Sequence, residues 1–382
     1  MSELPHDTFR RTRHFPSLDG LRALGVLAVI WHHVVDPSEP WGYVGVSLFF
    51  ALSGFLITTL LLREQADVGY VSLGKFYMRR ALRIFPVYYA VLAAYTVLVL
   101  VTEPHSGAGQ QFLGHLPYFL TYTSNWFVDL GSGSRVIFYF AWSLATEEQF
   151  YLLWPSVVRF GRKWQQPVLF MVMLLLIDQM AEWYSARTPA SAHVLPLRIA
   201  TSVATPICLG CLAAYASDRP GSFRVLAASL GRTWMSPLLL LLLIPAVTFG
   251  APMLLTHVLL VLLVVSCCVQ PAHLLLPLLT NRMMLYIGSI SYGMYLMHML
   301  ALNATRRVLP VNWQSPTVTY LAVAMVTVLV AGVSYRTYER WFLGLKDRYR
   351  ADAARPYRRP AQRSEDVAPL PHDTLLARQG GA

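Results

Sequence analysis

The sequence contains few charged residues. Asp, Glu, Lys and Arg make up 13% of its 382 residues, whereas hydrophobic residues make up 55%. Soluble domains usually carry about 25% charged residues, and so few charges cannot cover a globular surface with polar groups. The composition therefore excludes a soluble globular protein and predicts an integral membrane protein whose outer surface faces lipid.

Cysteine is also scarce, and the four cysteines are Cys208, Cys211, Cys267 and Cys268. All four lie within apolar stretches. Cys208 and Cys211 have the C-x-x-C spacing of a redox or zinc motif, but no second pair of ligands lies nearby. We expect the four side chains to be small buried hydrophobic groups, and we expect no metal site.

Two other features are missing. No small-residue cleavage site follows the basic N-terminus and the first apolar run, so we expect that run to remain as a helix. No internal repeat is visible, whereas transporters are often built from two similar halves. The sequence also gives no sign of a second folded domain.

Long apolar runs are abundant, and a membrane-spanning helix needs roughly 20 such residues. The runs predict an all-α bundle of about ten spans near 16–36, 43–62, 82–102, 143–161, 167–186, 194–216, 235–249, 252–270, 284–305 and 317–338. The segment 111–128 is apolar but short and mixed. It fits a re-entrant or interfacial helix.

The distribution of Lys and Arg predicts the orientation. With both termini in the cytoplasm, 26 of the 31 basic residues lie on the cytoplasmic side. The net charge of +11 is then a signal of topology and does not require nucleic acid as a partner. We expect a cytoplasmic segment over 1–15, a transmembrane domain over 16–345 and a disordered basic cytoplasmic tail over 346–382.

Ionisable side chains within a membrane are costly, so each is a candidate for function. Arg22 and His33 are eleven residues apart in the first predicted span. At about 100° and 1.5 Å per residue, both lie on one helix face, about 16 Å apart along the axis. An arginine can also reach the lipid headgroups without a functional role.

Arg80 and Arg83 lie where a predicted cytoplasmic loop enters the third span, and they share a helix face. Two guanidinium groups presented together suit the phosphates of a polyanion. Anchoring at the cytoplasmic boundary is the alternative.

Glu147 and Glu148 open the predicted span 143–161, on the outer side and at the level that His33 reaches. A carboxylate beside an imidazole is an ordinary arrangement for general-base chemistry. Capping of the helix with Ser143 is the alternative. Further candidates are Trp142 and Ser143 before the pair, and Tyr295 and His298 on one face of the ninth predicted span, for which a structural role is equally open.

Taken together and in order, these segments resemble the acyltransferase-3 family of bacterial membrane O-acyltransferases. The matching stretches are SLDGLRALGVLAVIWHH, GVSLFFALSGFLITTLLL, FYMRRALRIFPVYY, WSLATEEQFYLLWP and SYGMYLMH. The similarity extends from about Ser17 to Glu339. One motif departs from the family pattern, because Glu339 is followed by Arg340 and Trp341 where the family often has Glu-x-Pro.

The resemblance implies transfer of an acyl group, commonly acetyl from acetyl-CoA, to hydroxyl groups of envelope glycans or of sugars on macrolides. The donor would be a substrate, with no permanently bound cofactor. The implied location is the bacterial inner membrane, with membrane lipids as partners. The family's arginine-x10-histidine motif falls on Arg22 and His33, its arginine pair on Arg80 and Arg83, and its glutamate pair on Glu147 and Glu148.

Residue chemistry and resemblance together suggest a mechanism. Arg80 and Arg83, with Arg22, would hold the phosphates of acyl-CoA at the inner boundary. His33, oriented by Glu147 or Glu148, would remove a proton from the acceptor hydroxyl, or would carry the acyl group as a transient acyl-histidine. A transporter of a glycan precursor, with these groups along its path, is the alternative of another class.

Overall fold

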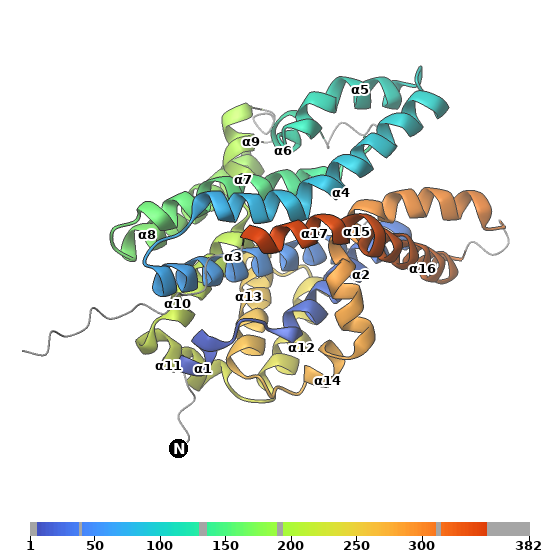
Figure 1. Ribbon diagram of the computed structural model, residues 1–382. Coiled ribbons are helices and arrows are strands. Elements are labelled where there is room, and N and C mark those ends of the chain that lie inside the picture. The colour runs from blue at the N-terminus through green and yellow to red at the C-terminus, as the bar shows by residue number, and fades with distance from the viewer. Residues whose placement is uncertain (1–5, 38–39, 130–135, 189–193, 311–314, 350–382) are drawn as a thin grey trace, which may run out of the picture.

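The structure is a computed structural model that describes residues 6–37, 40–129, 136–188, 194–310 and 315–349. These residues form helices and connections, with no strand among them (Figure 1). The all-α prediction is therefore confirmed. The helices of the first half are α1 (His6–Arg11), α2 (Pro16–Val34), α3 (Trp41–Val68), α4 (Leu73–Thr102), α5 (Gly107–Leu120), α6 (Ser124–Phe127), α7 (Ala141–Phe160) and α8 (Gln165–Arg187).

The second half continues with shorter helices, followed by the long helices α15 and α16 and the short helix α17. They are α9 (Leu195–Thr201), α10 (Thr205–Asp218), α11 (Pro220–Leu230), α12 (Met235–Thr248), α13 (Met253–Val269), α14 (Leu276–Leu279), α15 (Arg282–Val308), α16 (Pro316–Ser334) and α17 (Arg340–Lys346). A π-helical turn over Tyr335–Glu339 joins α16 to α17, and a 3₁₀ turn over Asp347–Tyr349 follows. Residues 350–382, most of the predicted tail, lie outside the described residues.

Several helices are long and apolar enough to cross a membrane. Within the described residues five meet this description, α3, α4, α8, α15 and the run from α16 to α17, and up to seven if two bent pairs each count as one span. One pair is α9 with α10, bent by 42°, so the predicted continuous helix 194–216 is broken. The other is α11 with α12, bent by 73°. A polytopic membrane protein is thus supported.

The predicted spans 16–36 and 143–161 are helical, as α2 and α7, but they are not among the helices apolar enough for a span. The reason is the polar residues that they carry, including Arg22 on α2 and Glu147 on α7. These polar groups face the interior of the bundle, where other protein groups replace lipid.

The predicted segment 111–128 forms two short helices, α5 and α6, in place of one. Ser106 caps α5, with its Oγ accepting a hydrogen bond from the backbone N–H of Gly109 at 2.9 Å. In Figure 1, α5 turns back from the end of α4 and lies beside its last turns, at the upper edge of the bundle.

Close helix contacts depend on glycine. α3 packs against α2 and α10, and α15 packs against α2 and α16. A Cβ on Gly54 would lie 2.2 Å from the carbonyl oxygen of Ile207, and a Cβ on Gly288 would lie 2.0 Å from that of Asp19. Small residues of this kind let membrane helices approach closely, so these two contacts fix how α3 and α15 sit against their neighbours.

The cysteines are buried, as expected, and form no disulfide with one another. Cys208 and Cys211 lie on α10 and Cys267 and Cys268 on α13. Within the described residues, no group of three or more His, Cys, Asp or Glu side chains is placed to hold a metal ion.

Candidate functional site

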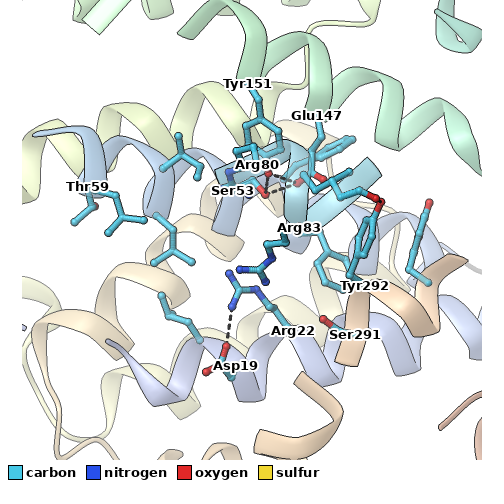
Figure 2. Close-up of a pocket in the computed structure, with 18 of the residues that line it drawn as sticks. Asp19, Arg22, Ser53, Thr59, Arg80, Arg83, Glu147, Tyr151, Ser291 and Tyr292 are labelled. Carbon is cyan, nitrogen blue, oxygen red and sulfur yellow. Dashed lines mark hydrogen bonds and ion pairs between the residues drawn. The ribbon is translucent and has the colours of Figure 1, made fainter. Parts of the chain in front are cut away.

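A cavity of about 260 Å³ opens between α2, α3, α4, α7 and α15. Five arginines and three acidic residues line its walls, so positive charge is in excess. They are Arg13, Arg22, Arg63, Arg80 and Arg83, and Asp19, Glu147 and Glu148. The structure therefore brings together the arginines and glutamates that the sequence singled out on three different helices. Figure 2 shows the guanidinium groups of Arg22 and Arg83 pointing toward each other across this cavity.

Arg22 is held by an acid one turn earlier on the same helix. Its Nη1 donates to Asp19 Oδ1 at 2.7 Å, and the second oxygen of Asp19 lies 2.9 Å from His14 Nε2. The carboxylate thus fixes the direction of the Arg22 side chain toward the cavity. Its negative charge also offsets part of the positive charge that arginines concentrate there.

Arg80 lies over an aromatic ring rather than beside a carboxylate. Its guanidinium carbon is 4.3 Å from the centroid of the Tyr151 ring, a cation–π contact. The Tyr151 hydroxyl donates to Glu147 Oε1 at 3.1 Å, and Ser53 Oγ donates to the same oxygen (Figure 2). Glu147 and Arg80 therefore belong to one connected group of side chains.

Arg83 has no hydrogen-bond or ion-pair partner within the described part of the chain, although its guanidinium can donate five hydrogen bonds. It lines the cavity between Arg22 and Arg80, and its side chain is exposed to that space. Glu339 lies close enough for the two charges to attract each other, but Glu339 is bonded to Ser334 at 3.1 Å. The Arg83 guanidinium is consequently available to an anion.

Arg63 has a different role, although it lines the same cavity. Its two terminal nitrogens donate to the backbone oxygens of Thr12 and Phe9, at 2.5 and 2.8 Å. Its guanidinium also lies over the rings of Phe9 and Phe15. Arg63 therefore fastens the N-terminal segment beside the cavity.

A hydrogen bond between α7 and α15 forms part of the cavity wall. Ser143 Oγ lies 2.6 Å from the Tyr295 hydroxyl, and both residues line the cavity wall. The same Ser143 Oγ donates back to Phe140 O at 3.1 Å, so Ser143 does not cap the start of α7, which begins at Ala141. Trp142 is not part of this wall and packs against Tyr43 with its ring stacked at 5.8 Å.

His298 lies directly behind this wall. Its Nδ1 donates to Tyr295 O at 2.5 Å, because a carbonyl oxygen can only accept, and its side chain is 1% exposed. Nε2 is buried and has no partner within the described residues. The His298 ring stacks on that of His33, with centroids 5.0 Å apart and an interplanar angle of 16°.

His33 is near the end of α2 and does not line the cavity. α2 is continuous from Arg22 to His33, as the shared-face prediction requires. The ring is separated from the cavity by Tyr295 and His298. His33 therefore lies on the far side of Tyr295 and His298 from the arginines that line the cavity.

The partner of the His33 ring is a phenol. The Tyr139 hydroxyl lies 2.9 Å from Nδ1 of His33. Glu147 is instead bonded to Ser53 and Tyr151, and Glu148 has no hydrogen-bond partner within the described residues. The prediction that a glutamate orients His33 is therefore wrong. The acids face the arginines because they lie one to two turns into α7, which packs against α3 and α4.

Several functional candidates are absent from the sequence-based set. Ser53, Tyr151 and Tyr139 contact the predicted residues directly. Tyr151 could have been found, since it is four residues after Glu147 and so lies on the same helix face. Tyr139 lies in the connection before α7, where no helical period could predict its direction.

The sequence pattern of a known family, described as "Acyltransferase domain", matches residues 15–336 of this chain. Two similar proteins are the peptidoglycan O-acetyltransferase OatA of Listeria monocytogenes, 28% identical over 360-odd aligned residues, and the O-acetyltransferase OatA of Staphylococcus aureus strain NCTC 8325, also 28% identical. The matches cover 88% and 86% of this chain and 58% and 57% of the relatives, so the chain spans less than two thirds of their length. No solved structure matches the chain.

Proposed function

The chain belongs to this acyltransferase domain family, and on that premise we propose that it is a membrane-embedded O-acyltransferase that moves an acyl group from acyl-CoA to a hydroxyl group. The family match confirms the family that the motifs predicted. The proposal adds the identity of the acyl donor. The observation that carries it is the cavity in which Arg22, Arg80 and Arg83 meet.

The donor follows from the charge of that cavity. Guanidinium groups bind phosphate oxygens through strong charge-assisted hydrogen bonds, and CoA carries several phosphates at one end and a thioester at the other. Arg83, without a partner of its own in the described residues, and Arg80 would hold the phosphates. The thioester end would then point along the cavity toward Ser143 and Tyr295.

The acyl transfer itself is assigned to His33. Its imidazole takes the proton of the acceptor hydroxyl while the hydroxyl oxygen forms a bond to the thioester carbonyl carbon. The carbon–sulfur bond then breaks, and the imidazolium returns the proton to the CoA thiolate. For this step the thioester has to pass Tyr295, because the cavity wall separates it from His33.

We propose that the donor and the acceptor reach the enzyme from opposite sides of the membrane. We propose that all ten predicted segments contribute to crossing the bacterial inner membrane, with both termini in the cytoplasm. The arginine end of the cavity then faces the cytoplasm, where acyl-CoA is found. His33 lies toward the outer side, where an envelope glycan is accessible.

The acyl group is proposed to be acetyl, since the relatives are named O-acetyltransferases. The acceptor is proposed to be a carbohydrate hydroxyl. One relative is named for peptidoglycan, which supports a cell-envelope glycan over a small sugar-containing metabolite. The positive charge of the cavity supports acyl-CoA as the ligand and offers no separate support for a transporter.

The test is acyl transfer by the purified protein in lipid vesicles. Labelled acetyl-CoA is supplied on the side of the N-terminus, and soluble peptidoglycan fragments on the other. We expect wild type to release free CoA thiol and to label the glycan, and His33→Ala to do neither while still binding CoA. Equal CoA release by wild type and His33→Ala would contradict the proposal.

A further inference from the structure

A phenol group lies next to the imidazole that the proposed function uses. The Tyr139 oxygen is 2.9 Å from His33 Nδ1 and 3.4 Å from Nε2. The two rings meet edge to face, with centroids 5.6 Å apart and an interplanar angle of 89°. Within the described residues, the His33 ring has no other hydrogen-bond partner. The nearer nitrogen, Nδ1, is therefore the one that Tyr139 binds.

The backbone holds Tyr139 firmly in this place. The residue before it, Phe138, has φ of +62°, a conformation that is rare for a bulky side chain and that tends to occur at functional sites. The Phe138 ring is buried and packs 5.0 Å from Tyr95 and 4.9 Å from Phe140. The N–H of Trp142 bonds to the Tyr139 carbonyl at 3.2 Å. The start of α7 and a buried aromatic cluster thus fix the direction of the phenol.

Two neighbouring imidazoles, those of His298 and His32, do not form a hydrogen bond with the ring nitrogens of His33. His298 stacks flat on His33, so its ring atoms lie above the His33 plane and not along its N–H bonds. Its own Nδ1 is bonded to the carbonyl oxygen of Tyr295. His32 meets His33 edge-on, with centroids 4.9 Å apart, and its ring fills the space in front of Gly42.

We propose that Tyr139 is a positioning residue for His33: its oxygen accepts a hydrogen bond from Nδ1–H and leaves the Nε2 lone pair free to take the proton of the acceptor hydroxyl. The inference rests on the proposed function, since it assigns the proton transfer to His33. The tautomer of a histidine is set by the hydrogen bond at its other nitrogen. In this chain a neutral phenol takes the place that a carboxylate was expected to fill.

The protonation state of the phenol agrees with this role. Tyr139 lies outside the helices, and burial raises the pKa of its hydroxyl to about 12. The phenol is therefore neutral at every pH at which the enzyme would work. A neutral phenol can accept a hydrogen bond from Nδ1–H without adding a negative charge near the acyl group.

The first test is kinetic and uses Tyr139→Phe, which keeps the ring and removes the oxygen. We expect kcat to fall by about tenfold or more, because an unoriented general base loses part of its effect, while the KM for acetyl-CoA changes little. The matched control is Tyr89→Phe, which loses a hydrogen bond to Leu120 O of similar length, 3.0 Å, far from His33. Equal activity of Tyr139→Phe and Tyr89→Phe would overturn the proposal.

The second test reads the tautomer directly, without activity. In protein labelled with ¹⁵N-histidine, the His33 signals are identified by their loss in His33→Ala. We expect His33 to carry its proton on Nδ1 in wild type and in Tyr89→Phe, and to shift toward Nε2–H in Tyr139→Phe. A role in packing alone would lower thermal stability and leave the tautomer unchanged, which would overturn the proposal.

The two readouts also separate this inference from the proposed function. An inactive wild type with the Nδ1–H tautomer at His33 would contradict acyl transfer and keep the hydrogen bond. An active wild type whose His33 tautomer is the same in Tyr139→Phe would keep acyl transfer and reject the role of Tyr139.

Discussion

The guanidinium of Arg80 lies over the ring of Tyr151, and the hydroxyl of that same ring is bonded to Glu147. The acid predicted to serve an imidazole is instead linked to an arginine that lines the cavity. On the proposed function, we therefore expect Glu147 to affect binding of the donor more than proton transfer, and steady-state kinetics can distinguish the two.

Glu147→Gln should raise the KM for acetyl-CoA more than it lowers kcat. The amide keeps a hydrogen-bonding oxygen for Ser53 and Tyr151 but removes the charge that balances Arg80. Steady-state kinetics of wild type and variant give both constants. A loss confined to kcat would instead support the predicted contact with His33. Ser53→Ala, which removes one donor to the same oxygen, should shift KM in the same direction.

Arg83→Ala should weaken CoA binding by about 10- to 100-fold, since a hydrogen bond to a charged group contributes roughly 1.5–3 kcal/mol. The matched control is Arg79→Ala. Arg79 is on the same helix, but it pairs with Glu64 at 3.1 Å and with the Tyr349 carbonyl at 2.9 Å and does not line the cavity. Calorimetry with CoA measures both. Equal losses would show that the charge of this region, and not Arg83, determines binding.

His33→Ala should lower kcat by about 100-fold or more, which is the usual contribution of a general base, with CoA affinity preserved. His32→Ala is the control at the neighbouring position and should remain within a few-fold of wild type. Both substitutions replace a histidine by alanine at adjacent positions of α2, so the two sites differ mainly in the direction of the imidazole. Wild-type turnover by His33→Ala would remove His33 from the mechanism.

Gly54→Ala should lower the thermal stability of the protein in detergent. The added Cβ would meet the Ile207 carbonyl at 2.2 Å and push α3 away from α10; such overpacking costs about 1–3 kcal/mol. Gly74→Ala is the matched control, because nothing lies within 4 Å of its Cβ position on α4. Its melting temperature should be equal to that of wild type or higher, since alanine favours a helix.

Tyr295→Phe should increase the release of CoA thiol in the absence of an acceptor. The substitution removes the hydrogen bond to Ser143 in the cavity wall, so we expect water and His33 to gain access to the thioester. Ser143→Ala removes the same bond from the other side and should act in the same direction. A thiol assay without glycan measures this leak, and an unchanged rate in both variants would show that the bond does not close the path.

The sequence predicted the helical class and the family because both depend on features that persist along the chain. Apolar runs, the clustering of basic residues and five motifs in register do not require knowledge of helix packing. The proximity of Arg22, Arg80 and Arg83 could also be predicted, since all three were expected to bind the same phosphates at the inner boundary of the membrane.

The sequence could not predict which side chains contact one another between helices. The way α7 packs against α3 and α4 decides whether Glu147 meets His33 or Arg80, and no period within a single helix contains that information. The direction of Tyr139 depends on the positive φ of Phe138, a conformation that the residue type disfavours. Similarly, the break between α9 and α10 lies within a run that is apolar throughout.

If the proposed function holds, the hydrogen bond between Ser143 and Tyr295 would have a metabolic consequence. A donor that stops at this bond would keep its thioester on the proposed cytoplasmic side of the wall, out of reach of the imidazole. The cell would then lose little acetyl-CoA while no acceptor glycan is bound, even though acetyl-CoA remains bound to the enzyme. Selective opening, rather than scarcity of the donor, would set how often an acetyl group leaves the cytoplasm.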